Sequence, residues 1–236
     1  MTIPNLSLIT DQRQMVQQLG AYAQDQIRWG KLIATLSTRH DWVDAATDNR
    51  LRNTTLSQDD GAWSGRAGLM YLFDNGLAPY ATWSTSFLPV IGTSSSGDPF
   101  APSTAQQFEV GLRYQPPGMP IMLSAAAFDI TQTNVATYAS ALLRYQNGEV
   151  RSRGIEFEAR GEILPGWNVM GAYTYLDAEV TRATNAEQGN RPIGAPAHTA
   201  SFWSDYTFQD GPLAGFGFGA GVRWIGSTIG GYMPNP

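Results

Sequence analysis

Residues 151–163 read RSRGIEFEARGEI, and their side chains alternate between two chemical kinds. One set includes Ile155, Phe157 and Ala159, and the set between them includes Glu156, Glu158 and Arg160. Successive side chains of a β-strand point to opposite faces of the sheet. The segment therefore predicts a strand with one apolar face and one charged face, and we expect the charged face to point away from lipid.

The same alternation recurs along the chain. It is clear in Gln107–Tyr114 and in 216–224, and weaker in the other candidate strands. These are about Gln14–Trp29, Lys31–Ala45, Ala62–Phe73, Leu77–Phe87, Pro120–Thr133, Trp167–Val180 and Ala197–Gln209. We predict ten antiparallel strands in five hairpins, with Gln14–Trp29 and Phe216–Ile225 at the unpaired edges of an open, curved sheet.

The predicted connections alternate between short and long. The short ones are rich in Gly, Pro, Asn and Asp, the residues that tight turns require, and lie at 29–31, 74–76, 115–118, 164–166 and 210–215. The long ones are about 46–61, 88–104, 134–148 and 181–196, with a fifth near 226. This rhythm predicts an up-and-down β-meander with turns at one end and loops without substantial helices at the other, which is typical of a transmembrane β-barrel.

Composition agrees with a barrel. Charged residues make up 15% of the chain, against about 25% in ordinary soluble domains, yet no run of 18 apolar residues exists that could form a spanning helix. The net charge of −5 and the lack of basic clusters argue against nucleic acid as a partner. The chain has no cysteine. A soluble all-β sandwich or barrel remains the alternative fold, since its strands also alternate.

The sequence contains no recognisable catalytic motif, and we predict that the chain is not an enzyme. It contains no Gly-x-Ser-x-Gly motif, phosphate loop or dinucleotide fingerprint. Glu156 and Glu158 lie two apart on one strand face and could suggest the carboxylate pair of a glycosidase, but we favour a water-exposed polar wall with Arg160 close by. The two histidines, His40 and His198, lack the spacing of metal ligands. Asp59-Asp60 and Gly97-Asp98 lie in predicted outer loops and could bind a cation, but turn chemistry explains both pairs.

Several segments resemble, in order and spacing, the TonB-dependent ferric-siderophore receptors, especially the hydroxamate-type branch. They are QLGAYAQDQ at 18–26, APYATWSTSF at 78–87, QFEVGLRY at 107–114, VRSRGIEFE at 150–158, GAYTYLDAEV at 171–180, RPIGAPAHTA at 191–200 and GAGVRW at 219–224. The likeness covers about residues 14 to 230. At 38–41 the chain reads TRHD, where the family more often has Gly before the Arg and Tyr after it.

The resemblance implies a fold and a function for a longer protein. Such receptors have a barrel of about 22 strands, closed by an N-terminal plug, and a short box that engages the energy-transducing TonB complex. We expect residues 1–236 to be a partial barrel domain, about strands nine to eighteen, with plug and box outside this chain. The resemblance further implies a Gram-negative outer membrane, contact with its lipid, and a ferric siderophore as ligand, with iron carried by the siderophore and no protein cofactor.

Four aromatic residues in or beside the predicted outer loops are candidate siderophore contacts, because an aromatic wall suits a bulky chelate. They are Phe87, Phe100, Tyr138 and Tyr145. Loop packing or an interfacial aromatic girdle would explain them as well. Two other function classes stay open on the residues alone: a passive porin or structural barrel, and an outer-membrane hydrolase.

Overall fold

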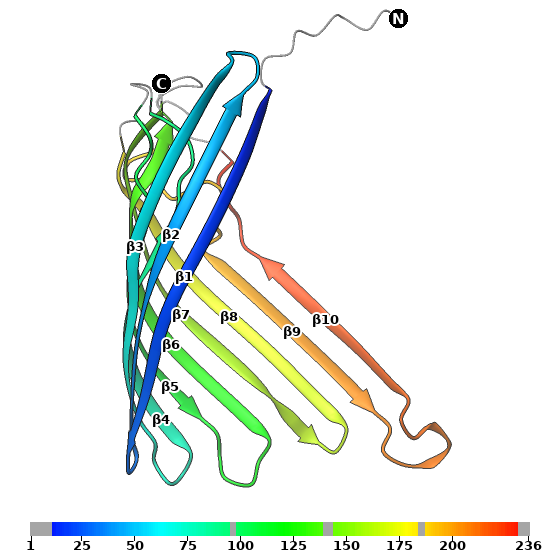
Figure 1. Cartoon of the computed structure of the whole chain (residues 1–236). Coiled ribbons are helices and arrows are strands. Elements are labelled where there is room, and N and C mark those ends of the chain that lie inside the picture. The colour runs from blue at the N-terminus through cyan, green and yellow to red at the C-terminus, as the bar shows by residue number, and fades with distance from the viewer. Residues whose placement is uncertain (1–10, 95–97, 139–143, 184–186, 231–236) are drawn as a thin grey trace, which may run out of the picture.

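The computed structural model describes residues 11–94, 98–138, 144–183 and 187–230. They form ten strands: β1 Gln12–Trp29, β2 Leu32–Asn49, β3 Thr54–Tyr71, β4 Leu77–Leu88, β5 Ser103–Tyr114, β6 Ile121–Tyr138, β7 Arg144–Leu164, β8 Trp167–Arg182, β9 His198–Thr207 and β10 Gly217–Ile225. All lie in one antiparallel sheet, each beside its neighbour in sequence. The sheet curves like a section of barrel wall (Figure 1).

This arrangement confirms the predicted all-β meander of ten strands. Within the described residues β1 and β10 each pair on one side only, so the sheet is open at the two predicted edges. No helix of the described chain is long and apolar enough to cross a membrane. A short 3₁₀ helix, Gly211–Leu213, lies between β9 and β10.

The turns and loops occupy opposite ends, as predicted. Gly30, Gly76, Gly118 and Gly166 all have positive φ in the tight turns, a conformation that glycine adopts without strain. The long connections between β4 and β5 and between β8 and β9 lie at the other end.

Two predicted loops are wrong in extent. The ladder of β2 and β3 continues through polar sequence to the pair Asn49↔Thr54, so most of 46–61 is strand. Likewise β6 continues to Tyr138 and β7 begins at Arg144, with register shifts between them, so most of 134–148 is strand. Hydrophobic alternation does not reveal these extensions, because a ladder uses backbone groups that every residue except proline supplies.

The register divides the sheet into two faces. One, which we call the outward face, carries the row Leu36, Ala67, Trp83 and Phe108, and continues through Ile155 and Phe157 on β7. The other, the inward face, carries Glu156, Glu158 and Arg160. The connection between β4 and β5 folds against the inward face through Gln58. The predicted division into an apolar and a charged face is confirmed from Ile155 to Ile163.

The outward face becomes charged toward the loop end of β6 and β7. Arg151 lies 2.6 Å and Arg153 3.4 Å from the Asp129 carboxylate. Both arginines are on the same face as Ile155, since Arg153 precedes it by two residues and Arg151 by four. The apolar band of this face therefore ends at about Ile155 on β7.

The ladder between β3 and β4 is short. β3 pairs with β2 over its whole length, but with β4 only from Arg66↔Ser84 to Met70↔Tyr80. Beyond Gly65 the two strands have no backbone pairs, and the Thr85 hydroxyl instead accepts the Gly65 N–H at 3.0 Å. We call this unpaired upper part of the β3–β4 junction the seam.

Candidate functional site

Three carboxylates gather on the inward face of β5 and β7, at Glu109, Glu156 and Glu158. Glu109 accepts the Tyr80 hydroxyl at 2.8 Å and the Gln107 amide at 2.9 Å. Small residues of β6 lie between the two acidic strands, since Ala126 pairs with Glu156 and with Gly111. We call this the acidic patch. Anionic groups that are held apart on an open wall can accept hydrogen bonds from cationic groups that face it.

One basic group near the acidic patch, Arg113, lies against an aromatic ring. The Arg113 guanidinium lies 5.1 Å from the centre of the Tyr80 ring, within range of a cation–π contact. Tyr80 thus joins Arg113 to Glu109, because its hydroxyl donates to the carboxylate while its ring contacts the cation.

A second charged cluster, on β1 and β2, is internally neutral. Asp41 is 4% exposed, and its two oxygens accept Arg39 Nε at 2.8 Å and Nη2 at 2.7 Å. Gln18 donates a further hydrogen bond to the same carboxylate at 2.9 Å. Paired, hydrogen-bonded charges of this kind can be buried without a large penalty. The cluster therefore reads as a structural part of the wall.

The β4–β5 loop, residues 89–102, is fastened to several strands by side-chain amides. The buried Gln58 of β3 donates to the carbonyls of Val90 at 3.0 Å and Phe100 at 2.7 Å. Asn134 of β6 donates to Pro102 at 3.0 Å, and Gln146 of β7 bonds both backbone groups of Ala101. The described parts of the loop, 89–94 and 98–102, are thus held against β3, β6 and β7 at the loop end of the sheet.

The structure describes the side chains of two of the four predicted siderophore contacts, Phe87 and Phe100. Phe100 is 4% exposed inside the β4–β5 loop. Phe87 pairs with Thr104 and shares the outward face with Trp83. The side chains of Tyr138 and Tyr145 lie outside the described residues. A role for any of the four in ligand binding stays a prediction.

The two histidines lie on the outward face in aromatic surroundings. The His40 ring is 4.3 Å from the Trp42 ring and 4.7 Å from the Trp63 ring, centre to centre. His198 Nδ1 is 2.9 Å from the Tyr173 hydroxyl. In the described ranges no group of three or more histidine, aspartate or glutamate side chains is arranged to hold a metal ion.

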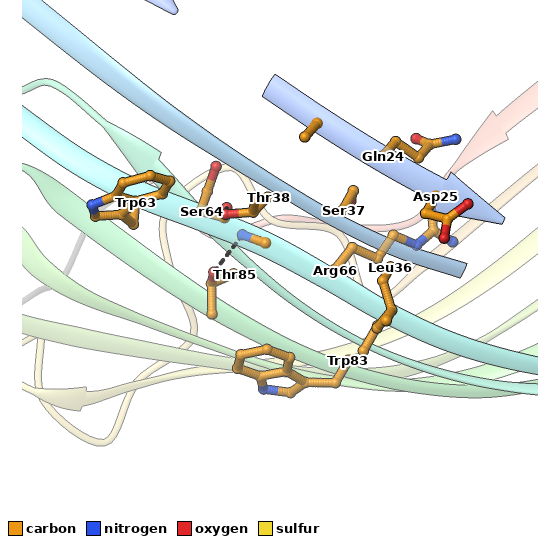
Figure 2. A pocket seen from close by; sticks show the side chains of 13 residues that line it. Gln24, Asp25, Leu36, Ser37, Thr38, Trp63, Ser64, Arg66, Trp83 and Thr85 are labelled. Carbon is orange, nitrogen blue, oxygen red and sulfur yellow. Dashed lines mark hydrogen bonds between the residues drawn. The ribbon is translucent and has the colours of Figure 1, made fainter. Parts of the chain in front are cut away.

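A shallow groove of about 610 Å³ hollows the wall where β1 to β4 adjoin the seam. Figure 2 shows Leu36 and Trp83 on one side of the strands, and Gln24 and Ser37 on the other. The dashed line there marks the bond between Thr85 and the Gly65 backbone. The groove is thus a consequence of the interrupted ladder.

Sequence reasoning missed Gln58, Tyr80 and the Arg39–Asp41 pair. In β2 the alternation is blurred because Thr38 and His40, both polar, occupy the outward face. Gln58 fell within a predicted loop. Its polarity in an extended strand would have been a signal only once the true length of β3 was known.

The family model described as "TonB dependent receptor-like, beta-barrel" matches residues 2–234. The chain therefore belongs to the TonB-dependent receptor family, within its β-barrel. It is 44% identical over 216 residues to the ferrichrome outer membrane transporter/phage receptor of Escherichia coli K12, covering 91% of this chain and 29% of the relative. It is 36% identical over 221 residues to the ferrioxamine B receptor of Salmonella typhimurium, covering 93% and 32%.

Solved structures agree in fold. The siderophore receptor PiuA of Acinetobacter baumannii superposes with a TM-score of 0.76 at 24% identity, over 91% of this chain and 34% of that one. The alcaligin receptor FauA of Bordetella pertussis gives 0.73 at 23% identity, over 91% and 38%. The chain thus spans about a third of the length of its relatives, and its open sheet corresponds to one section of a larger barrel.

Proposed function

We propose that this chain is the barrel section of an outer-membrane receptor that imports ferric siderophores, with hydroxamates as the class of chelate. The observation that carries the proposal is the 44% identity to a ferrichrome transporter over 91% of the chain. A polar inward wall and an apolar outward face are what a lumen and a lipid surface require.

In this proposal the wall provides a binding surface and catalyses no reaction. The ferric ion stays within the siderophore, and the wall offers carboxylates, arginines and hydroxyls along its inward face. Energy comes from the TonB complex, acting through parts of the receptor outside this chain. We propose no enzymatic activity and a Gram-negative outer membrane as location.

The test is iron uptake by the complete receptor that carries this chain, in cells without other siderophore receptors. Radioactive iron is supplied as ferrichrome, as ferrioxamine B, and as a ferric catecholate for comparison. We expect uptake of a hydroxamate complex that disappears when TonB is deleted. Entry of all three complexes at equal rates, independent of TonB, would instead identify a passive pore.

A further inference from the structure

The inward face of β1 to β4 holds a cation that the wall itself does not neutralise. Arg66 lies on β3 between two serines, with Ser37 of β2 and Ser84 of β4 as its cross-strand partners. Among the described residues no ion pair or hydrogen bond engages its guanidinium. The side chain is exposed on the wall.

The neighbours of Arg66 leave room around its guanidinium and add donors to it. Ser37, Ser64 and Ser84 line the same inward pocket of about 460 Å³. Each carries a short hydroxyl that can donate to an oxygen atom beside the arginine. Larger residues at these three positions would fill the space that the pocket provides.

The other arginine of the pocket does not compete for the same ligand. Arg39 pairs with Ser64 across the β2–β3 ladder, but two of its nitrogens are already bonded to Asp41. The Arg39–Asp41 pair contributes no net charge, so the charge of the pocket is that of Arg66. Tyr22, 75% exposed, stands beside Arg39 and supplies an open aromatic surface.

The acidic patch lies on the same face but is displaced from Arg66. In the row that contains Arg66, the residue two strands away on β5 is Gln107, which binds Glu109. Two strand spacings separate β3 from β5, roughly 10 Å. The wall therefore has a basic, hydroxyl-lined region and an acidic region side by side.

We propose that the pocket around Arg66 is an oxyanion subsite that takes a carboxylate or a similar planar oxyanion. A guanidinium can bind both oxygens of a carboxylate at once, and the serine hydroxyls donate to the lone pairs that remain. Two sources supply this chemistry: a small anionic chelate in the lumen, or an acidic side chain of a protein segment that fills it. The identity of these two sources rests on the proposed receptor function. The oxyanion subsite itself is argued from the wall alone.

The test measures charge preference with a thiol placed in the pocket. Ser84→Cys is made in the complete receptor and in a version without the plug domain that the family carries. Its reaction rate is measured with two methanethiosulfonates, one bearing a sulfonate and one a trimethylammonium group. We expect the sulfonate to react faster, and Arg66→Gln to lower the ratio of the two rates about tenfold, since each reagent carries one charge of opposite sign close to the arginine.

Matched variants separate charge from structure. Arg66→Lys should keep the preference, and Ala126→Cys, beside Glu156 in the acidic patch, should prefer the cationic reagent whether or not Arg66 is changed. Heat-modifiable migration on gels checks that each variant is folded. Equal rates at Ser84→Cys, a ratio that Arg66→Gln leaves unchanged, or a thiol that reacts in neither version overturns the proposal.

The same measurement distinguishes the two sources of the oxyanion. Protection of the thiol in the complete receptor that is lifted by removing the plug identifies a protein carboxylate. Protection that appears only on adding ferric citrate, as the anionic probe, identifies a small-molecule site. Because no transport is measured, a receptor that fails to import siderophores leaves this result intact.

Discussion

Strands β7 and β3 are held in the sheet by different means. Residues 144–161 of β7 pair with β6, and residues 149–164 of β7 pair with β8. The strand therefore has a neighbour on both sides along most of its length. β3 has a complete ladder with β2 but only a short one with β4. At the seam, a side chain forms the hydrogen bond that a backbone group forms in the paired parts of the sheet.

The difference shows how the wall accommodates a fixed loop. Buried backbone groups need hydrogen-bond partners, and at the seam Thr85 supplies one for Gly65. Gln58 satisfies two carbonyls of the β4–β5 loop.

The largest effect is expected where the ladder is unbroken. A Cβ atom at Gly154 would lie 2.3 Å from the Tyr175 carbonyl oxygen and 2.5 Å from the Phe128 ring. Gly154→Ala should therefore destabilise the barrel by about 1–3 kcal/mol, as overpacking does, measured by urea unfolding of the complete receptor in detergent. Gly171→Ala is the control, since its Cβ would come no closer than 3.7 Å to another atom. Equal stability of the two variants would show that β7 and β8 are not closely packed.

The next effect concerns the fastening of the β4–β5 loop. Gln58→Leu removes the buried amide and leaves the carbonyls of Val90 and Phe100 without their donor, which should cost about 2 kcal/mol. We expect faster limited proteolysis within residues 89–102. Gln26→Leu, on β1 and remote from the β4–β5 loop, should leave the cleavage rate unchanged. If both variants are cleaved alike, the loop is held by something other than Gln58.

A smaller effect is expected at the seam itself. Thr85→Val keeps the shape of the side chain but removes the hydroxyl that accepts the Gly65 N–H. One hydrogen bond is worth about 1 kcal/mol, so hydrogen exchange of the Gly65 amide should accelerate about fivefold. Thr82→Val, at a position where β3 and β4 are paired, is the control. An unchanged exchange rate would mean that the β3–β4 ladder continues beyond Gly65.

The smallest effect is expected at the turn end, where the β3–β4 ladder is intact. The hydrogen bond from Lys31 to Asp74, followed by their Coulomb attraction, raises the lysine pKa above its ordinary value of 10.5. The folded state is thus favoured at pH below 10.5, and this contribution is lost as pH rises through the raised pKa. Lys31→Met should change the melting temperature only slightly between pH 6 and 9, and less in high salt. A strong dependence on pH in that range would contradict this assignment.

The two faces of 151–163 could be predicted from sequence, because alternating side chains project to alternate faces in any strand. The edges and tight turns followed from the same pattern together with the turn residues. The length of β3 could not be predicted, since its upper half is polar on both faces and pairs through the backbone. The acidic patch could be predicted only in part. Glu156 and Glu158 lie two apart in sequence and so share a face, but only the register of β5, β6 and β7 shows that Glu109 lies on that face too.

By itself, then, the sequence determined the class of fold and the division of each clear strand into two faces, because both depend on local periodicity. The tertiary structure decided which strands pair fully and which separate, and so where Gln58 and Arg66 lie. Those positions depend on contacts between residues far apart in the chain. Arg66 acquires its serine neighbours from β2 and β4, and no pattern within β3 alone contains that information.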